Sequence, residues 1–403
     1  MSTCFALRLI LACEHLAFYI SFPSVALLAL DETNGLLQGE GLASQRVLLY
    51  GILITVYPLL QIFAAPFVGR RLDERPKKLV LQLIHFAGFI GYVLIAASAW
   101  TKMTTLAVMG LAIPSAVGAP LPIIKALAAL ASDKQERLKE FSKIALVKGA
   151  SSLVGPFLGF WIVTMAPSWG YIAPLATSAL LSLVGLLLTN RLIGSTKEPS
   201  SPSVPSFGTL FPPRELLVQQ FPMLLGLFCF AGGYCTFLKF VPVVWSHDVK
   251  EGLLMFSSFS AFVGFSTLLN QLFISRWIQL SPKLIPTFAR LLCLGLFCLC
   301  MSPFTLLSWV GLLLILFCYS LLITCIETKL SLSGMEKTQG RIQGMLYSIE
   351  NCSYLVGPGI AAWVASFEPL YSLYFILILA CVSAVVVHSS AYYNVSAEKT
   401  QLE

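Results

Sequence analysis

Long apolar runs separated by short polar breaks fill the chain from one end to the other. Each run is about 20 residues or longer, which is the length that an α-helix needs to cross the hydrocarbon core of a bilayer. Twelve such runs occur, at about 5–30, 47–68, 79–99, 104–131, 143–165, 171–193, 220–245, 253–275, 284–302, 305–330, 343–366 and 369–392. The pattern predicts an all-α membrane protein with twelve transmembrane helices, the first of which is too long for the core of a signal peptide.

The break between the sixth and the seventh run is rich in Ser and Pro, and it includes Pro202 and Pro205. This composition is typical of a linker. It divides the chain into an N-terminal six-helix half at 1–194, a cytoplasmic linker at 195–219 and a C-terminal six-helix half at 220–403.

Two short repeats indicate that the halves are related. The segment Leu153–Pro156 in the fifth run recurs as Leu355–Pro358 in the eleventh, 202 positions later. Arg70, after the second run, recurs as Arg276 after the eighth, 206 positions later. Two matches at equivalent places predict pseudo-symmetric halves related by an axis along the membrane normal, an architecture found in transporters.

The orientation follows from the Lys and Arg content of the short loops. If the N-terminus is cytoplasmic, the outer loops hold only Arg46, Lys102 and Lys250. The inner loops then hold Arg70, Arg71, Arg75, Lys77, Lys78, Lys134, Arg137, Lys139, Lys197, Arg214, Arg276, Lys283, Lys337 and Arg341. Both termini are therefore predicted to be cytoplasmic.

Composition narrows the function further. Only 11% of the residues are charged and 57% are hydrophobic, which argues against a soluble enzyme. The net charge of +7 belongs to the inner loops, so no nucleic-acid partner is expected. The cysteines and histidines lack metal-ligand spacing, and no G-x4-G-K-[ST] loop for a nucleotide occurs. No metal and no cofactor other than a proton gradient is expected.

The segment after the second run carries a recognisable pattern. Gly69, Asp73, Lys77 and Lys78 fit the signature G-x-x-x-D-x-x-G-[RK]-[RK] of the major facilitator superfamily, which the chain resembles over nearly its whole length. Pro76 replaces the second glycine, so the turn there has a fixed φ. The resemblance implies a cytoplasmic gate loop in which Asp73 accepts hydrogen bonds at a helix N-terminus. A solvated charge run is the alternative.

Small residues recur in the fifth run. Gly149, Gly155, Pro156 and Gly159 resemble the G-x5-G-P-x2-G-G pattern of the antiporter, or efflux, branches of that superfamily, and only Phe160 departs from it. Small side chains let helices pack backbone to backbone, and proline removes one backbone donor so that a helix can bend. The resemblance implies a hinge between the halves, and small-residue packing without a role in transport is the alternative.

Glu14 lies about three turns into the first run. An ionisable side chain costs about 2.5–3.5 kcal/mol at the centre of a bilayer, so it needs a reason to be there. First-helix carboxylates recur in the proton-coupled exporters that the chain resembles, and Glu14 is therefore predicted to bind the coupling proton or a substrate cation. A structural hydrogen bond to another helix is the alternative, and His15 is expected to be structural.

Four further charges are placed symmetrically. Lys125 and Glu327 differ by 202 positions, and so do Lys148 and Glu350. All four are expected in the cytoplasmic third of their runs, and we predict that they form inter-half charge pairs when the cytoplasmic side closes. Snorkelling of Lys125 to the headgroups is one alternative, and an anionic-substrate site on the lysines is another.

The predicted function is export of a small drug-like or siderophore-like molecule across the bacterial cytoplasmic (inner) membrane by alternating access and proton antiport. The expected partners are this substrate and the lipid bilayer, and the protein is expected to be a monomer. A nutrient or metabolite importer, a symporter of the same fold, is the alternative. A membrane sensor without transport is disfavoured because the short linker is the longest soluble segment.

Overall fold

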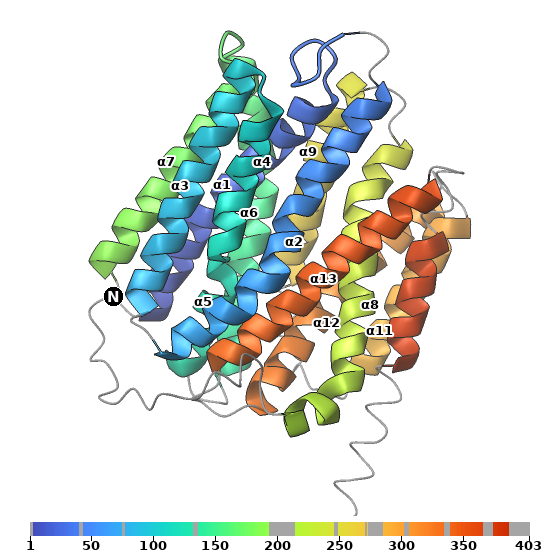
Figure 1. Cartoon of the computed structure of the whole chain (residues 1–403). Helices are drawn as coiled ribbons and strands as arrows, with labels where there is room; N and C mark the ends of the chain where they lie inside the picture. Colours follow the sequence, from blue (N-terminus) through green and yellow to red (C-terminus); the bar gives the residue numbers. More distant parts are fainter. Residues whose placement is uncertain are drawn as a thin grey trace, which may run out of the picture.

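The structure is a computed structural model, and it describes residues 3–39, 43–74, 77–131, 136–192, 214–245, 249–270, 272, 285–301, 306–333, 339–365 and 374–386. The described residues form helices joined by short turns and loops. The helices pack side by side as a bundle, and α1 starts at the lower end of the view (Figure 1).

The helices reproduce the expected spans. The first six spans correspond to α1 (Thr3–Leu30), α2 (Ala43–Glu74), α3 (Lys77–Thr101), α4 (Thr104–Val117), α5 (Pro120–Ala131), α6 (Arg137–Met165) and α7 (Ile172–Leu192). The last six correspond to α8 (Arg214–Trp245), α9 (Val249–Leu269), α11 (Ile285–Met301), α12 (Leu306–Ser333), α13 (Gln339–Ala365) and a final helix over Tyr374–Val386. Because α4 and α5 form one span, the all-α fold with twelve spans is confirmed.

The fourth span is broken, whereas the sequence pattern predicts one run over 104–131. Helix α4 ends before Gly118, which has a φ of 120° and a ψ of 177°. This backbone conformation is open almost only to glycine. Pro120 starts α5 and has no N–H to continue the ladder, so the chain changes direction there. Discontinuous helices of this kind line binding sites in many transporters.

The segment that carries the superfamily signature is mostly helical, whereas the sequence pattern predicts a loop. Helix α2 continues through Pro58 and Pro66 to Glu74, and α3 begins at Lys77, so these two prolines do not end the helix. Lys78 Nζ donates to the Asn190 carbonyl oxygen at the end of α7, at 2.6 Å. The side chains of Gly69, Asp73 and Lys77 lie outside the described residues, so the gate role of this segment stays a prediction.

Glycines set several of the closest helix contacts. Gly91 of α3 faces Gly110 of α4 so closely that a Cβ added at Gly91 would lie 2.5 Å from the Gly110 carbonyl oxygen. In the last six spans Gly295 of α11 faces Gly311 of α12 in the same way, at 2.8 Å. The same kind of contact therefore recurs between corresponding helices, although the division of the chain at 194 and 219 itself stays a prediction.

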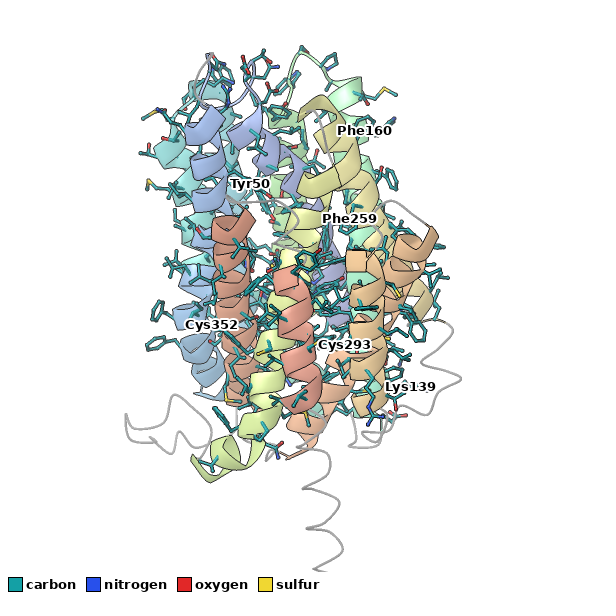
Figure 2. All side chains as sticks on the ribbon, turned by 90° about the vertical axis from the view of Figure 1, so that its right-hand side faces the viewer. Tyr50, Lys139, Phe160, Phe259, Cys293 and Cys352 are labelled. Atoms are coloured by element: carbon teal, nitrogen blue, oxygen red, sulfur yellow. The ribbon has the colours of Figure 1, made fainter. Side chains whose placement is uncertain are left out.

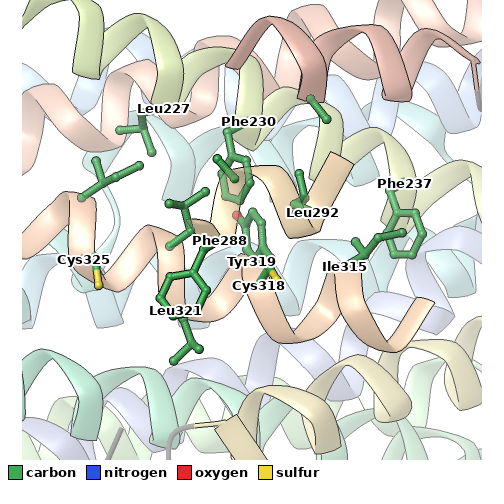
Figure 3. Close-up of a cluster of buried hydrophobic side chains, with 14 of the residues drawn as sticks. Leu227, Phe230, Phe237, Phe288, Leu292, Ile315, Cys318, Tyr319, Leu321 and Cys325 are labelled. Carbon is green, nitrogen blue, oxygen red and sulfur yellow. The ribbon is translucent and has the colours of Figure 1, made fainter. Parts of the chain in front are cut away.

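Three clusters of buried apolar side chains hold the described helices together. One fills the last six spans and surrounds Phe230, Leu292 and Tyr319 (Figure 3). The first six spans hold two separate clusters, one around Leu11 and Ile84 and one around Leu28 and Ile95. The packed interior of the first six spans is thus interrupted between its two ends.

Polar contacts fix the loop that follows α1. Arg46 of α2 is buried and pairs with Glu32 at 3.2 Å. Asp31 accepts hydrogen bonds from the Tyr171 hydroxyl and from the Thr33 backbone N–H. Burial raises the pKa of the Asp31 carboxyl, but these hydrogen bonds outweigh burial and lower its pKa to about 2. Asp31 is therefore charged at neutral pH and anchors this end of the bundle.

The break in the fourth span can be tested with Gly118→Ala. Alanine adopts the φ of Gly118 only with strain, so the free energy of unfolding should fall by about 1–3 kcal/mol. Thermal unfolding followed with a thiol-reactive dye measures this, since free cysteines such as Cys229 are buried. Gly51→Ala is the control, because a Cβ at Gly51 meets no atom within 4 Å. Equal melting of both variants would contradict the strained turn.

Candidate functional site

The first six and the last six spans meet where α2 crosses α13 and where α6 packs against α9 (Figure 1). At the first crossing the Tyr57 and Tyr347 hydroxyl oxygens are 3.2 Å apart, within hydrogen-bond distance. The Ser348 hydroxyl also donates to the Ile62 carbonyl oxygen at 2.8 Å. Polar groups buried between the two sets of spans mark the candidate pathway.

Aromatic side chains gather beside this interface. Tyr319 of α12 stacks on Tyr234 and on Phe230 of α8, and the Tyr319 and Phe230 ring centroids are 4.9 Å apart (Figure 3). Tyr354 of α13 is hydrogen-bonded with Tyr319. Tyr19 of α1 lies within electrostatic reach of Tyr234. The interface therefore offers ring faces and hydroxyl groups, which suit a planar ligand with polar edges.

Glu14 of α1 lies inside the first six spans, with its side chain 19% exposed. Its Oε2 atom is 3.5 Å from Nδ1 of His85 on α3, whose side chain is fully buried. Tyr57 and Tyr92 lie within electrostatic reach of the carboxylate. Glu14 thus lies near the tyrosine that reaches the interface and directly beside a second ionisable group.

Sequence reasoning missed His85, because it considered this histidine only as a possible metal ligand. The available signal was position. His85 lies within Lys78–Thr101, a candidate span with a mean hydropathy of 2.1, where an ionisable side chain needs a reason. Among the residues that the structure describes, no group of three or more His, Cys, Asp or Glu side chains is placed to hold a metal ion.

The predicted charge pairs are brought together only in part. Lys125 of α5 and Glu350 of α13 line one pocket with Tyr347. Glu350 is 5% exposed, whereas Lys148 is exposed. The side chain of Glu327 lies outside the described residues. The structure therefore places Lys125 at the same pocket as Glu350, while the pairs Lys125–Glu327 and Lys148–Glu350 stay predictions.

Two of the predicted hinge glycines press α6 against α1. A Cβ added at Gly155 would lie 2.5 Å from Tyr19 Cβ, and one added at Gly159 would lie 2.5 Å from the Ile20 carbonyl oxygen. Pro156 lies within α6 without ending the helix. These glycines hold α6 against a helix of its own set of spans.

The third glycine faces the other set of spans. A Cβ at Gly149 would lie 3.1 Å from the Leu268 backbone nitrogen on α9. On α9, Gly264 approaches the Leu153 backbone nitrogen of α6 even more closely. Helix α6 runs the full thickness of the bundle, with Lys139 near one end and Phe160 near the other (Figure 2). It touches α1 on one side and α9 on the other.

Two pockets of the described structure are both small. One, at Lys125 and Glu350, lies between the two sets of spans, and the other, between Tyr234, Tyr319 and Leu292, lies within the last six spans. Each has room for only about one water molecule. Sites for drug-sized ligands enclose roughly 300 Å³ or more, so binding such a ligand here requires the two sets of spans to separate.

The comparison with known proteins agrees with this geometry. A family model described as Major Facilitator Superfamily matches residues 8–333, most of the chain. The chain belongs to the major facilitator superfamily. It is a multi-pass membrane transporter and not an enzyme, as the sequence predicts.

The proteins to which the chain is similar include two named for tetracycline resistance. Tetracycline resistance protein, class D, of Salmonella ordonez is 24% identical over 329 residues, which cover 79% of this chain and 80% of that protein. Tetracycline resistance protein, class B, of Escherichia coli is 23% identical over 332 residues, 77% of each chain. The structure of the human organic anion transporter MFSD10 (TETRAN) superposes with a TM-score of 0.74 at 18% identity, over 95% of this chain and 98% of that one. At that identity the structural likeness shows the fold alone.

The tight contact in this transporter predicts the effect of Gly155→Leu. A bulky side chain would push α1 away from α6, so the variant should insert into the membrane but lose at least about 1–3 kcal/mol of stability. Thermal unfolding of the purified protein measures the loss. Gly359→Leu on α13 is the control, because a Cβ at Gly359 meets no atom within 4 Å. A Gly155→Leu variant as stable as this control would refute the contact.

The pocket at Lys125 and Glu350 predicts which lysine matters. If Lys125 is the partner of Glu350, Glu350→Ala and Lys125→Ala should each cost about 3–5 kcal/mol, since each strands a buried charge. The exchanged variant, Lys125→Glu with Glu350→Lys, should recover part of the loss, and Lys148→Ala should have little effect. Thermal unfolding and cysteine accessibility from the inner side measure this. A large effect of Lys148→Ala with none of Lys125→Ala would restore the original pairing.

Proposed function

We propose that this transporter exports a small organic molecule in exchange for protons. The observation that carries the proposal is the Glu14 carboxylate, which lies deep among the first six spans and 3.5 Å from His85. A carboxylate in this setting can bind and release a proton as its access to water changes. Its proximity to Tyr57, which meets Tyr347 across the interface, connects proton binding with the path of the substrate.

The aromatic surface supports a planar substrate. Stacked rings such as Tyr234 and Tyr319 favour a ligand with fused rings, and their hydroxyls favour polar edges. Two relatives are named for resistance to tetracycline, a molecule of this kind. A drug-like substrate of fused rings is therefore proposed, and a siderophore-like chelator with ring hydroxyls is the second candidate.

The proposed location is the bacterial cytoplasmic membrane. Lys139 lies at the lower end of the bundle (Figure 2), and Lys78, near the start of α3, bonds to Asn190 at the end of α7. This arrangement supports a cytoplasmic position for that end and for both termini. We propose that the protein acts there as a monomer, because each chain contains both sets of spans that form the pathway.

Purified protein in proteoliposomes tests the direction of coupling. With tetracycline outside, an acidic lumen drives uptake by an antiporter, because protons leave as the substrate enters. An alkaline lumen instead drives uptake by a symporter, which would support the nutrient importer. Gly155→Leu is the inactive control. Uptake that ignores both gradients would overturn proton coupling.

The role of Glu14 predicts the behaviour of Glu14→Gln. Glutamine imitates the protonated carboxyl group, so accumulation driven by the pH gradient should fall to background. Exchange of labelled for unlabelled substrate at equal pH should remain within about twofold of the wild type, since it needs no proton transfer. Glu136→Gln, at an exposed position just before α6, is the matched control. Undiminished uphill transport by Glu14→Gln would show that the proton binds elsewhere.

A further inference from the structure

A polar layer divides the apolar interior of the first six spans. Below it lies the cluster around Leu11 and Ile84, and above it the cluster around Leu28 and Ile95. Glu14 lies between Leu11 and Leu28 on α1, and His85 lies between Ile84 and Ile95 on α3. Ionisable groups therefore occupy the level at which apolar packing is interrupted.

The helices leave room for the His85 ring at this level. A Cβ added at Gly185 of α7 would lie 2.9 Å from both Cε1 and Nδ1 of His85, so only a glycine fits there. A Cβ added at Gly88, one turn along α3 from His85, would lie 3.5 Å from the Ser182 hydroxyl and 4.0 Å from Glu14 Oε2. The two glycines thus let these polar side chains pack closely where α1, α3 and α7 meet.

The polar atoms of these packed side chains lack hydrogen-bond partners. Both ring nitrogens of His85, Oε2 of Glu14 and Oγ of Ser182 are buried without a hydrogen bond in the described structure. Buried polar atoms are normally satisfied, and each exception needs an explanation. A proton on Nδ1 of His85 would explain this exception, because Nδ1 would then be a charged donor facing Oε2 of Glu14.

The corresponding level of the last six spans is apolar. Gly91 of α3 and Gly295 of α11 make matching contacts and can be aligned with each other. With this alignment, Ala289 of α11 corresponds to His85 of α3. Helix α8 is aligned with α1 in the same way, through one matching serine contact and one matching glycine contact. This alignment places the position equivalent to Glu14 between Met223 and Leu227. All three residues belong to the continuous apolar cluster. The fold therefore does not need ionisable side chains at this level.

The other ionisable side chains on the helices around His85 are not placed at its ring. Helix α4 carries no titratable side chain, and Arg191 of α7 is exposed at the inner end. Tyr57 of α2 and Tyr92 of α3 lie on the side of Glu14. Lys125 of α5 lines the pocket with Glu350. Glu14 is the acidic group that the described structure places at His85.

We propose that His85 and Glu14 form one proton-binding site inside the first six spans. The bound proton resides on the imidazole and faces the carboxylate, with Ser182 available as a hydrogen-bond partner. Glu14 is partly exposed and His85 is sealed, so the proton enters past Glu14. When the proton leaves, a lone carboxylate remains, which favours conformations that bring water to Glu14. The site would supply the coupling step of the proposed antiport.

Infrared difference spectra of the purified, substrate-free protein between about pH 4 and 9 test this site without transport. The proposed site holds its proton on the imidazole beside the ionised Glu14 carboxylate, and each variant removes one of these two groups. Replacing the histidine, as in His85→Gln, should make the protonated carboxyl band of Glu14 appear about one pH unit or more higher. Glu14→Gln should move the histidine signal about one unit or more lower. The band is assigned by its absence in Glu14→Gln.

Two controls keep the test decisive. His15→Gln changes a neighbour of Glu14 that faces Lys125 and Lys148, and it should leave the carboxyl band in place. If His85→Gln does not fold, Gly185→Ala displaces the His85 ring and should shift the band in the same direction, while Gly359→Ala should not. A carboxyl band at the wild-type pH in both His85→Gln and Gly185→Ala would overturn the site. Transport that ignores a pH gradient would refute the proposed antiport alone and leave this result standing.

Discussion

The close packing of α6 against α1 and α9 is the interaction on which the rest of the structure depends. Lipid is as apolar as the side chains, so helices in a bilayer associate through close packing and hydrogen bonds rather than through the hydrophobic effect. Gly155 and Gly159 place α6 against the backbone of α1, and Gly149 places it against α9. Because Tyr19 and Ile20 lie just over one turn beyond Glu14, this contact also fixes the depth of the carboxylate. A shift of α9 along α6 therefore reaches the helix that carries Glu14.

The polar layer in the first six spans is tolerated because apolar packing continues on both sides of it. The cluster around Leu11 and Ile84 closes the end at which α1 starts, and that around Leu28 and Ile95 closes the opposite end. Each cluster joins α1 to α3 independently. The two helices thus hold Glu14 and His85 at a fixed separation although neither side chain adds to the apolar core. Because α1 and α3 are held rigidly, a change of charge at Glu14 and His85 acts on the interface between the two sets of spans and is not absorbed by local rearrangement.

The sequence predicts the elements of this fold far better than their partners. Apolar length is enough to place the twelve spans, because each helix must satisfy its own backbone in lipid. Apolar length does not predict the break at Gly118, because the sequence stays apolar across the break. The available signal was the pair of prolines, Pro114 and Pro120, on either side of this glycine. Spacing along the sequence grouped four charges, of which the structure places Lys125 and Glu350 at one pocket. That Lys125 rather than Lys148 lines the pocket of Glu350 depends on how α5 packs against α13, and no local pattern records it.

Magnitudes decide which group sets the conformational preference of the transporter. The hydrogen bond between Tyr57 and Tyr347 crosses the interface and contributes about 0.5–1.5 kcal/mol, so it can break in every cycle. Moving a two-state equilibrium from one side to the other takes about 5.5 kcal/mol. An unpaired buried charge costs several kcal/mol, which is of that order. The charge state of Glu14 and His85, together with the charges at Lys125 and Glu350, can therefore drive the change of state. The tyrosines at the interface set only the geometry in which the two sets of spans meet.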